Sequence, residues 1–212
     1  MERTIDMQEV SDGRFYTAND LVKADCGGCR GCSACCRGMG TSVILDPYDS
    51  FCLCAGLGMS FEELLQERVE LNLADRLILP NLKMAGEEEA CTFLSGEGRC
   101  DIHGFRPGMC RLFPLGRYYE NGGFRYFLQV HECPKEKKGK IKVKKWLGIE
   151  EIGRYERFIL DWHDYLKALR EEVEADPERI REISLELLRR FYMEPYGTAA
   201  DFYGQFYERM RG

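Results

Sequence analysis

Cysteines are the residues of this chain whose number and spacing could support chemistry. There are 11 cysteines among 212 residues, and most of them fall in two dense stretches, 26–36 and 91–110. An odd number of cysteines packed in this way makes a poor disulfide framework. Thiolates crowded into short segments are typical ligands of metal ions, so the composition predicts a metal-binding protein.

The first stretch repeats one spacing, because Cys29, Cys32 and Cys35 stand three positions apart and Cys36 follows directly. The turn between such thiols is tight enough to point both sulfurs at one metal or one cluster edge, and ferredoxin-type ligation uses similar runs. Because adjacent side chains are expected to diverge, the Cys35–Cys36 pair predicts two neighbouring sites or one multinuclear site.

The second stretch places Cys91, Cys100 and Cys110 within twenty residues, and a further cysteine follows at Cys133. Cys133 precedes Pro134, and a cysteine followed by proline is familiar late in the ligand sets of cluster proteins.

These segments together resemble the CxxCxxCC cysteine-cluster family, the YkgJ-like zinc- or iron-chelating proteins, of which the flagellin lysine-N-methylases are longer relatives. The resemblance covers roughly residues 26–134. It rests on the cysteine run, on a Cys-x-x-Leu element at Cys91–Leu94, and on a longer element at Cys100–Pro114. In two places the chain departs from the family: His103 stands where tyrosine is usual, and Cys26 extends the run upstream.

The resemblance implies eight metal ligands, which divide into two sets of four. These ligands are Cys29, Cys32, Cys35, Cys36, Cys91, Cys100, Cys110 and Cys133. Two [4Fe–4S] clusters or two tetrathiolate zinc sites would each use that number. The unbroken run ending in two adjacent cysteines favours iron–sulfur clusters, and zinc is the alternative. Spacing does not assign individual cysteines to one site or the other.

Other residues near the cysteines have supporting roles in this interpretation. Arg106 and Arg111 bracket Cys110, and we expect them to contact the cofactor as donors to thiolate sulfur or as anchors for carboxylates. Cys26 is either an additional ligand or a redox-active thiol. His103 is expected to pack or to form hydrogen bonds, and Cys52 and Cys54 are interpreted as small buried apolar residues of a helix.

The charge balance limits the classes of partner. With 30 Lys and Arg against 36 Asp and Glu, the formal net charge is −6, which argues against nucleic-acid binding. The lysine-rich segment 135–145 reads as a solvated loop, with a docking patch for an acidic partner as the alternative. No apolar segment is long enough for a bilayer and the start does not resemble a signal peptide, so we expect a cytoplasmic protein.

The elements that must position these residues indicate an α+β fold. We expect a cysteine-cluster domain over residues 1–147, irregular and ordered by metal, and a helical appendage over 148–212 that packs on this domain or on a partner. Capping and periodicity predict a β-hairpin around 121–123 and the following further elements: helices over 17–23, 47–56, 61–73, 150–173, 177–192 and 202–210, and a strand over 41–45. Residues 77–115 are expected to be mostly irregular.

Three functions fit these expectations. The first is an iron–sulfur protein with a redox or group-transfer role, and the second is a zinc-stabilised module that binds a protein partner. The third, lysine N-methylation of a protein substrate, is implied only by the longer relatives. No glycine-rich phosphate loop and no nucleophile-elbow sequence is present, so the sequence does not establish an enzymatic activity.

Overall fold

The computed structural model describes residues 6–27, 32–135 and 138–212, and its fold is α+β, as the sequence predicts. The helices are α1 (Met7–Val10), α2 (Pro47–Leu57), α3 (Phe61–Glu67), α4 (Gly108–Leu112), α5 (Val143–Leu147), α6 (Ile152–Ala175), α7 (Ile180–Leu188) and α8 (Phe202–Arg211). The strands are β1 (Ser11–Tyr16), β2 (Leu21–Asp25), β3 (Val69–Ala74), β4 (Leu77–Leu82), β5 (Met84–Ala85), β6 (Ala90–Cys91), β7 (Leu115–Glu120), β8 (Gly123–Gln129) and β9 (Gly139–Lys142).

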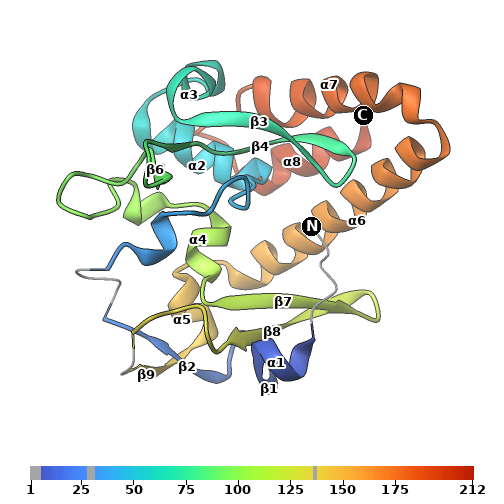
Figure 1. Cartoon of the computed structure of the whole chain (residues 1–212). Helices are drawn as coiled ribbons and strands as arrows, with labels where there is room; N and C mark the ends of the chain where they lie inside the picture. Colours follow the sequence, from blue (N-terminus) through green and yellow to red (C-terminus); the bar gives the residue numbers. More distant parts are fainter. Residues whose placement is uncertain (1–5, 28–31, 136–137) are drawn as a thin grey trace.

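The strands form small antiparallel sheets in separate parts of the molecule. The largest has the order β1-β8-β7, and the others are the pairs β2-β9, β3-β4 and β5-β6. In Figure 1, α2, α3, β3, β4, α7 and α8 form an upper layer, and the β7-β8 and β2-β9 pairs form a lower one. Helix α4 and the beginning of α6 lie between the two layers.

The predicted hairpin is confirmed. Strands β7 and β8 pair from Leu115 opposite Leu128 to Glu120 opposite Gly123. Asn121 and Gly122 make the turn, with φ values of 50° and 69°. Residues that tolerate a positive φ are what a tight hairpin turn requires, which is why the local sequence is sufficient to predict it.

Two predictions for short segments are wrong. Residues 21–25 form β2 rather than part of a helix, because Val22 and Ala24 alternate into the core and the strand pairs with β9. Residues 41–45 form no strand; Ile44 makes a single bridge to Asn81 of β4. Both outcomes depend on partners far away in the sequence.

Helices α2 and α3 begin at the predicted caps. Asp46 and Asp49 form a capping box at α2, which ends at Gly58 in the left-handed conformation. Ser60 and Glu63 form a second box at α3, but this helix stops at Glu67 rather than reaching residue 73. The residues beyond it pair with β4 as β3, so sheet formation overrides helix propensity there. The segment 77–115 is likewise more regular than expected, since it contains β4, β5, β6 and α4.

The predicted C-terminal helices are confirmed, and α7 and α8 belong to the upper layer. Helix α6 buries Tyr155, Phe158 and Trp162 along one face, as its spacing predicts. Helix α7 contacts β4, where the Ser184 hydroxyl accepts a hydrogen bond from the Ile78 amide at 3.0 Å. One cluster of buried apolar side chains therefore includes residues from Tyr16 to Phe206.

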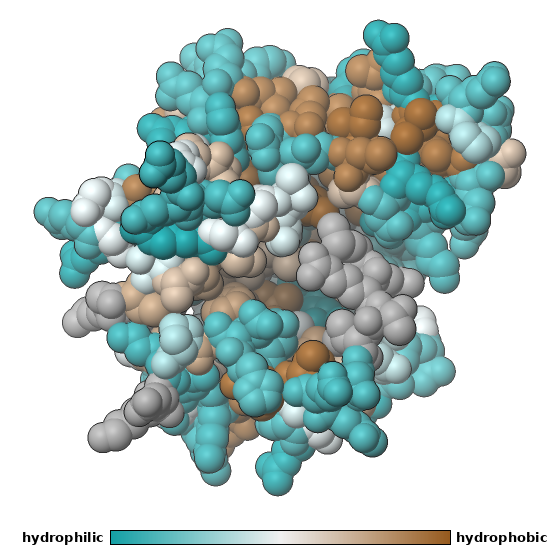
Figure 2. Space-filling model, viewed as in Figure 1, coloured by the Kyte–Doolittle hydropathy of each residue, from teal (hydrophilic) through white to brown (hydrophobic). Residues whose placement is uncertain are grey.

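Part of the upper layer presents apolar side chains to solvent. Leu71 and Leu73 of β3 and Leu185 of α7 are exposed, and Figure 2 shows apolar surface over these elements. None of the helices in the described part of the chain is both long enough and apolar enough to cross a membrane.

Candidate metal centre

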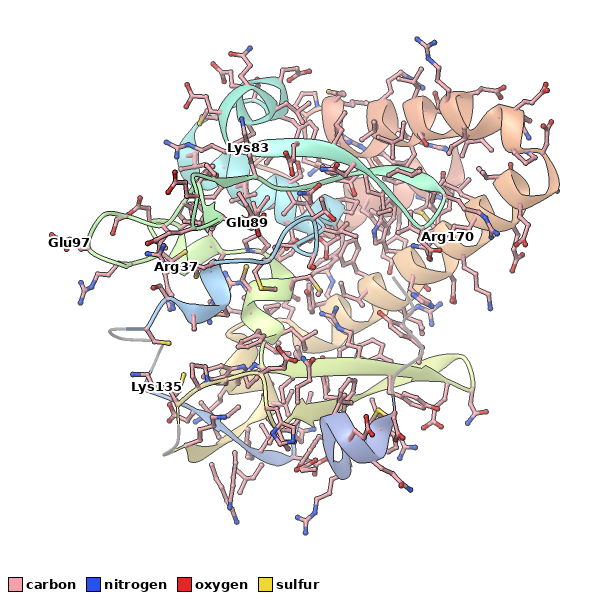
Figure 3. The ribbon with its side chains drawn as sticks, in the orientation of Figure 1. Arg37, Lys83, Glu89, Glu97, Lys135 and Arg170 are labelled. Atoms are coloured by element: carbon pink, nitrogen blue, oxygen red, sulfur yellow. The ribbon has the colours of Figure 1, made fainter. Side chains whose placement is uncertain are left out.

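The end of the cysteine run is held against strand β6. Residues 34–36 form a single 3₁₀ turn, in which the Cys36 amide donates to the Ser33 carbonyl at 2.9 Å. Arg37 forms a β-bridge with Ala90 and an ion pair with Glu88, and the Gly38 amide donates to the Glu89 carbonyl at 3.0 Å. Figure 3 shows Arg37 and Glu89 on these adjoining segments. The run is thereby placed beside Cys91, the last residue of β6.

The loop between Cys91 and Cys100 is closed by backbone contacts that bring the two cysteines together. Leu94 forms a bridge to Cys100, and its amide donates to the Cys91 carbonyl at 2.8 Å. Each thiol also accepts a backbone hydrogen bond from the residue two positions later, Phe93 for Cys91 and Ile102 for Cys100. Burial raises the pKa of both thiols, and these amide donors oppose that rise. Amide donors aimed at sulfur are a property of metal-bound thiolates.

Cys110 lies on α4, a short helix that is anchored from α2. The Gly108 amide at its start donates to Oδ1 of the buried Asp49 at 2.6 Å. Burial raises the pKa of the Cys110 thiol, and the charges of Asp49, Cys91 and Cys100 raise it further. Asp49 was not identified from the sequence as a site residue; only its position in the α2 capping box could have indicated it.

Residues 91, 100 and 110 therefore form one group, which we call the inner cysteine group. Cys110 interacts electrostatically with both other members, and Cys35 of the upstream run interacts with Cys100. The structure thus joins two cysteine stretches that are more than fifty residues apart in the sequence. That meeting is what the predicted ligand set requires, although spacing alone could not establish it.

Arg106 lies among these thiols. Its positive charge acts to lower the pKa of Cys35, Cys100 and Cys110. For Cys100 and Cys110, burial has the larger effect and raises the pKa. Its Nη1 is 2.7 Å from Nε2 of His103, while its Nε is buried and has no hydrogen-bond partner among the described residues. A buried donor without an acceptor costs free energy. An anionic metal–thiolate centre would supply the missing acceptor.

Arg111 has different surroundings. Its guanidinium donates to the carbonyls of Gly104 at 2.7 Å, Arg106 at 2.8 Å and Leu147 at 3.3 Å. These bonds join the loop before α4 to the end of α5. In the described structure Arg111 therefore positions the backbone around Cys110, whereas Arg106 is adjacent to the sulfurs.

A second group of cysteines lines a small pocket. We call it the Cys26 pocket, and its lining consists of Cys26, Cys32, Cys35, Phe113, Pro114, Cys133, Pro134, Lys135 and Trp146. The pocket is mostly apolar apart from Lys135, which Figure 3 shows near the lower layer, below Arg37. Cys35 belongs to this pocket and also approaches Cys100, so it stands between the two groups.

The expectation that the side chains of Cys35 and Cys36 diverge is wrong in this structure. Their thiols are hydrogen-bonded to each other, and this bond is the main cause of a raised pKa at Cys35, followed by burial. The contact leaves Cys36 next to Cys35, at the junction of the inner cysteine group and the Cys26 pocket.

Of the remaining cysteines, two lie on α2 and one lies outside the described residues. Cys52 and Cys54 lie on α2, where their thiols interact with the hydroxyls of Tyr48 and Ser50, and burial raises the pKa of Cys52 to about 12. Cys29 lies outside the described residues. Within the described ranges, no three His, Cys, Asp or Glu side chains already converge at the distances that hold a single metal ion.

The residues present nevertheless fit a thiolate-bound metal. The inner cysteine group combines sulfur donors, backbone amides directed at two of the sulfurs, and the unpaired buried Nε of Arg106. The Cys26 pocket adds four more thiols around one space. Sulfur-only donor sets of this kind select zinc or iron–sulfur clusters.

Comparisons with known proteins give one match. Residues 28–136 match the CxxCxxCC family, described as "Putative zinc- or iron-chelating domain". No curated protein and no solved structure matches the chain. The matched range begins after Cys26 and includes the inner cysteine group.

Proposed function

We propose that this chain, which belongs to the CxxCxxCC family of zinc- or iron-chelating domains, holds two iron–sulfur centres of the [4Fe–4S] type and serves electron or group transfer. Family membership supports chelation of zinc or iron by the cysteine cluster. The choice of iron–sulfur, the number of centres and the redox role are the proposal.

One observation carries the proposal: the two cysteine stretches meet around Arg106. The Arg37–Ala90 bridge places the end of the run beside Cys91, and the Leu94–Cys100 bridge closes the downstream loop, so the charges of Cys35 and Cys110 are felt in the same region as Cys100. A ligand set for a multinuclear centre needs several thiolates from separate segments facing one space. The repeated three-residue spacing that ends in two adjacent cysteines favours a cluster over a single zinc ion.

The residues around the sulfurs would tune such a centre. Hydrogen bonds to the sulfurs and burial are among the factors that set the reduction potential of an iron–sulfur cluster, which supplies one-electron chemistry when bound. Here the Phe93 and Ile102 amides donate to Cys91 and Cys100, and Arg106 supplies positive charge. A cluster with four thiolates carries a net negative charge, which Arg106 would offset.

The eight ligands that we propose are those implied by the family pattern. They are Cys29, Cys32, Cys35, Cys36, Cys91, Cys100, Cys110 and Cys133. The same thiolates could hold two zinc ions in a zinc-stabilised module, and the amide donors at Cys91 and Cys100 suit a structural zinc site equally well.

Anaerobic purification followed by metal and acid-labile sulfide analysis separates the two candidates. We expect a brown protein that contains iron and sulfide in similar amounts. Stoichiometric zinc without sulfide would overturn the iron–sulfur assignment and support the zinc module. Absence of any bound metal would overturn both.

Matched serine variants test the location of the site. Cys100→Ser should lower the metal content, because it removes a central member of the inner cysteine group. Cys54→Ser changes a half-buried cysteine of α2 that interacts with Ser50, and it should keep the wild-type metal content. Equal losses in the two variants would show that metal content reports on folding rather than on ligation.

A further inference from the structure

Cys26 is one of three cysteines outside the family pattern, and unlike Cys52 and Cys54 it directly precedes the cysteine run. The family match begins at residue 28, yet Cys26 lines the same pocket as Cys32, Cys35 and Cys133. Two of these partners come from the run and the third comes from a segment more than one hundred residues away.

Strand pairing fixes Cys26 in this position. Cys26 directly follows β2, whose Asp25 pairs with Gly139 at the start of β9. Cys133 follows β8 on the way to β9, and its carbonyl accepts a hydrogen bond from Nζ of Lys138 at 3.1 Å. The β2-β9 ladder therefore holds Cys26 beside the segment that carries Cys133. This closeness comes from a backbone ladder and does not depend on a bound metal.

The remaining lining of the pocket suits an inorganic centre. Phe113, Pro114 and Pro134 present apolar surface, which restricts water around metal–sulfur bonds. Trp146 forms another wall, 8% exposed, and its Nε1 donates to the Phe113 carbonyl at 3.2 Å. Lys135 places a positive charge on the lining, and the anionic charge of a metal with four thiolates calls for such a counter-charge.

We propose that Cys26, Cys32, Cys35 and Cys133 form the ligand set of one metal centre in the Cys26 pocket, and that the inner cysteine group belongs to the other. This inference rests on the proposed function and deepens it, because it divides the cysteines between the two centres and adds a ligand outside the family pattern. Cys36 adjoins both centres through Cys35. The inner cysteine group has three members, so its fourth thiolate is either Cys36 or Cys29, and Cys29 lies outside the described residues. The division therefore uses eight of these nine cysteines.

Metal analysis of single and double variants tests this division. Total iron plus zinc is measured in anaerobically purified wild type, Cys26→Ser, Cys100→Ser and the double variant. We expect each single variant to lose about half of the metal and the double variant to lose nearly all of it. Wild-type metal content in Cys26→Ser would overturn the inference while leaving the proposed function intact. A metal-free wild-type protein would overturn the proposed function as well.

Tryptophan fluorescence supplies a local readout. The chain has two tryptophans, and Trp162 is buried among Phe191, Tyr192 and Phe206, away from the pocket. In a Trp162→Phe background the emission therefore reports on Trp146. We expect a bound centre to quench this emission, and Cys26→Ser to restore it severalfold whereas Cys100→Ser does not. Equal emission in both variants would contradict the division.

Cysteine alkylation of the wild-type protein avoids any dependence on variant folding. Under native anaerobic conditions Cys26 should resist iodoacetamide as strongly as Cys32 and Cys133, and all three should react together after a chelator removes the metal. Mass spectrometry identifies the alkylated positions. Rapid labelling of Cys26 in the metal-loaded protein, or a disulfide that contains it, would overturn the assignment.

Discussion

Arg106 and Arg111 lie five residues apart, yet their guanidinium groups serve different parts of the molecule. The Arg111 guanidinium donates to carbonyls before α4 and at the end of α5, while the buried Nε of Arg106 has no hydrogen-bond partner among the described residues. The sequence alone does not distinguish the two arginines, because both lie close to Cys110. Their roles differ because the guanidinium nitrogens of the two residues differ in burial and in the hydrogen-bond acceptors around them.

Arg106→Gln should weaken metal retention. The change removes the positive charge beside Cys100 and Cys110, and the loss of such an outer contact typically costs about 10–100-fold in metal affinity. Retention is measured by competition with a chelator. Arg99→Gln is the matched control, because Arg99 directly precedes Cys100 in the sequence but its side chain is exposed. Equal losses in both variants would mean that general charge, rather than the buried position, matters.

The carboxyl groups at the start of α2 give a pH prediction. Burial raises the pKa of Asp46 to about 6, against the opposing effects of backbone donors and Arg117. The folded state then holds the proton more tightly than the unfolded chain, whose aspartate titrates near 3.8. Stability attributable to Asp46 is therefore present below about pH 4 and is lost as pH rises towards 6.

Asp46→Asn should remove this dependence and keep the helix cap, since asparagine is also a good N-cap. Relative to wild type, the variant should gain about 1–2 kcal/mol of unfolding free energy between pH 4 and 7, less than the full shift because Asp46 and the neighbouring Asp49 titrate together. Denaturant titrations at several pH values measure this difference in unfolding free energy. Parallel curves for the two proteins would contradict the raised pKa.

At the scale of elements, the position of α4 depends on close packing as well as on hydrogen bonds. The Gly108 amide is bonded to Asp49 of α2, and a Cβ at this glycine would collide with the hydroxyl of Tyr155 on α6. The Tyr155 hydroxyl also accepts a hydrogen bond from Arg117 of β7 at 3.1 Å. Elements from both layers therefore meet at the helix that carries Cys110.

Gly108→Ala should destabilise the protein by about 1–3 kcal/mol, because the added methyl group overpacks this contact. Thermal or denaturant unfolding measures the loss, and Tyr155→Phe in the same chain should recover part of it by removing the colliding oxygen. Gly153→Ala on α6 is the control. A Cβ there meets nothing within 4 Å, so this change should be neutral or stabilise by up to about 1 kcal/mol. Destabilisation by both changes would count against the packing argument.

At the scale of the whole molecule, the candidate metal ligands lie between two layers, and contacts that do not involve a metal stabilise each layer. The upper layer is held by buried aromatic side chains such as Phe158, Phe206 and Tyr192, whose hydroxyl donates to the Leu45 carbonyl at 2.8 Å. The lower layer is held by β-ladders. The division into domains 1–147 and 148–212 stays a prediction, while the apolar core includes residues from both ranges.

Removal of metal should therefore loosen the cysteine segments more than the helices. After anaerobic treatment with a chelator, we expect amide hydrogen exchange to increase at least tenfold across residues 32–36 and 91–110. Exchange within α6 and α7 should change little, because their protection comes from apolar packing. Global loss of protection on metal removal would instead mean that the metal centres are required for the whole fold.

Local features of the sequence determined much of this protein. The capping boxes before α2 and α3, the glycine turn of the hairpin and the apolar stripe of α6 depend on neighbours a few residues away, so spacing alone predicts them. The cysteine pattern likewise indicated a metal-binding family. Tertiary structure decided the rest. Strand β2 exists because β9 pairs with it, and α3 ends early because β4 pairs with the residues that follow. The placement of Cys26 beside Cys133, and of Arg106 rather than Arg111 among the sulfurs, depends on contacts between distant segments, which the order of residues does not reveal.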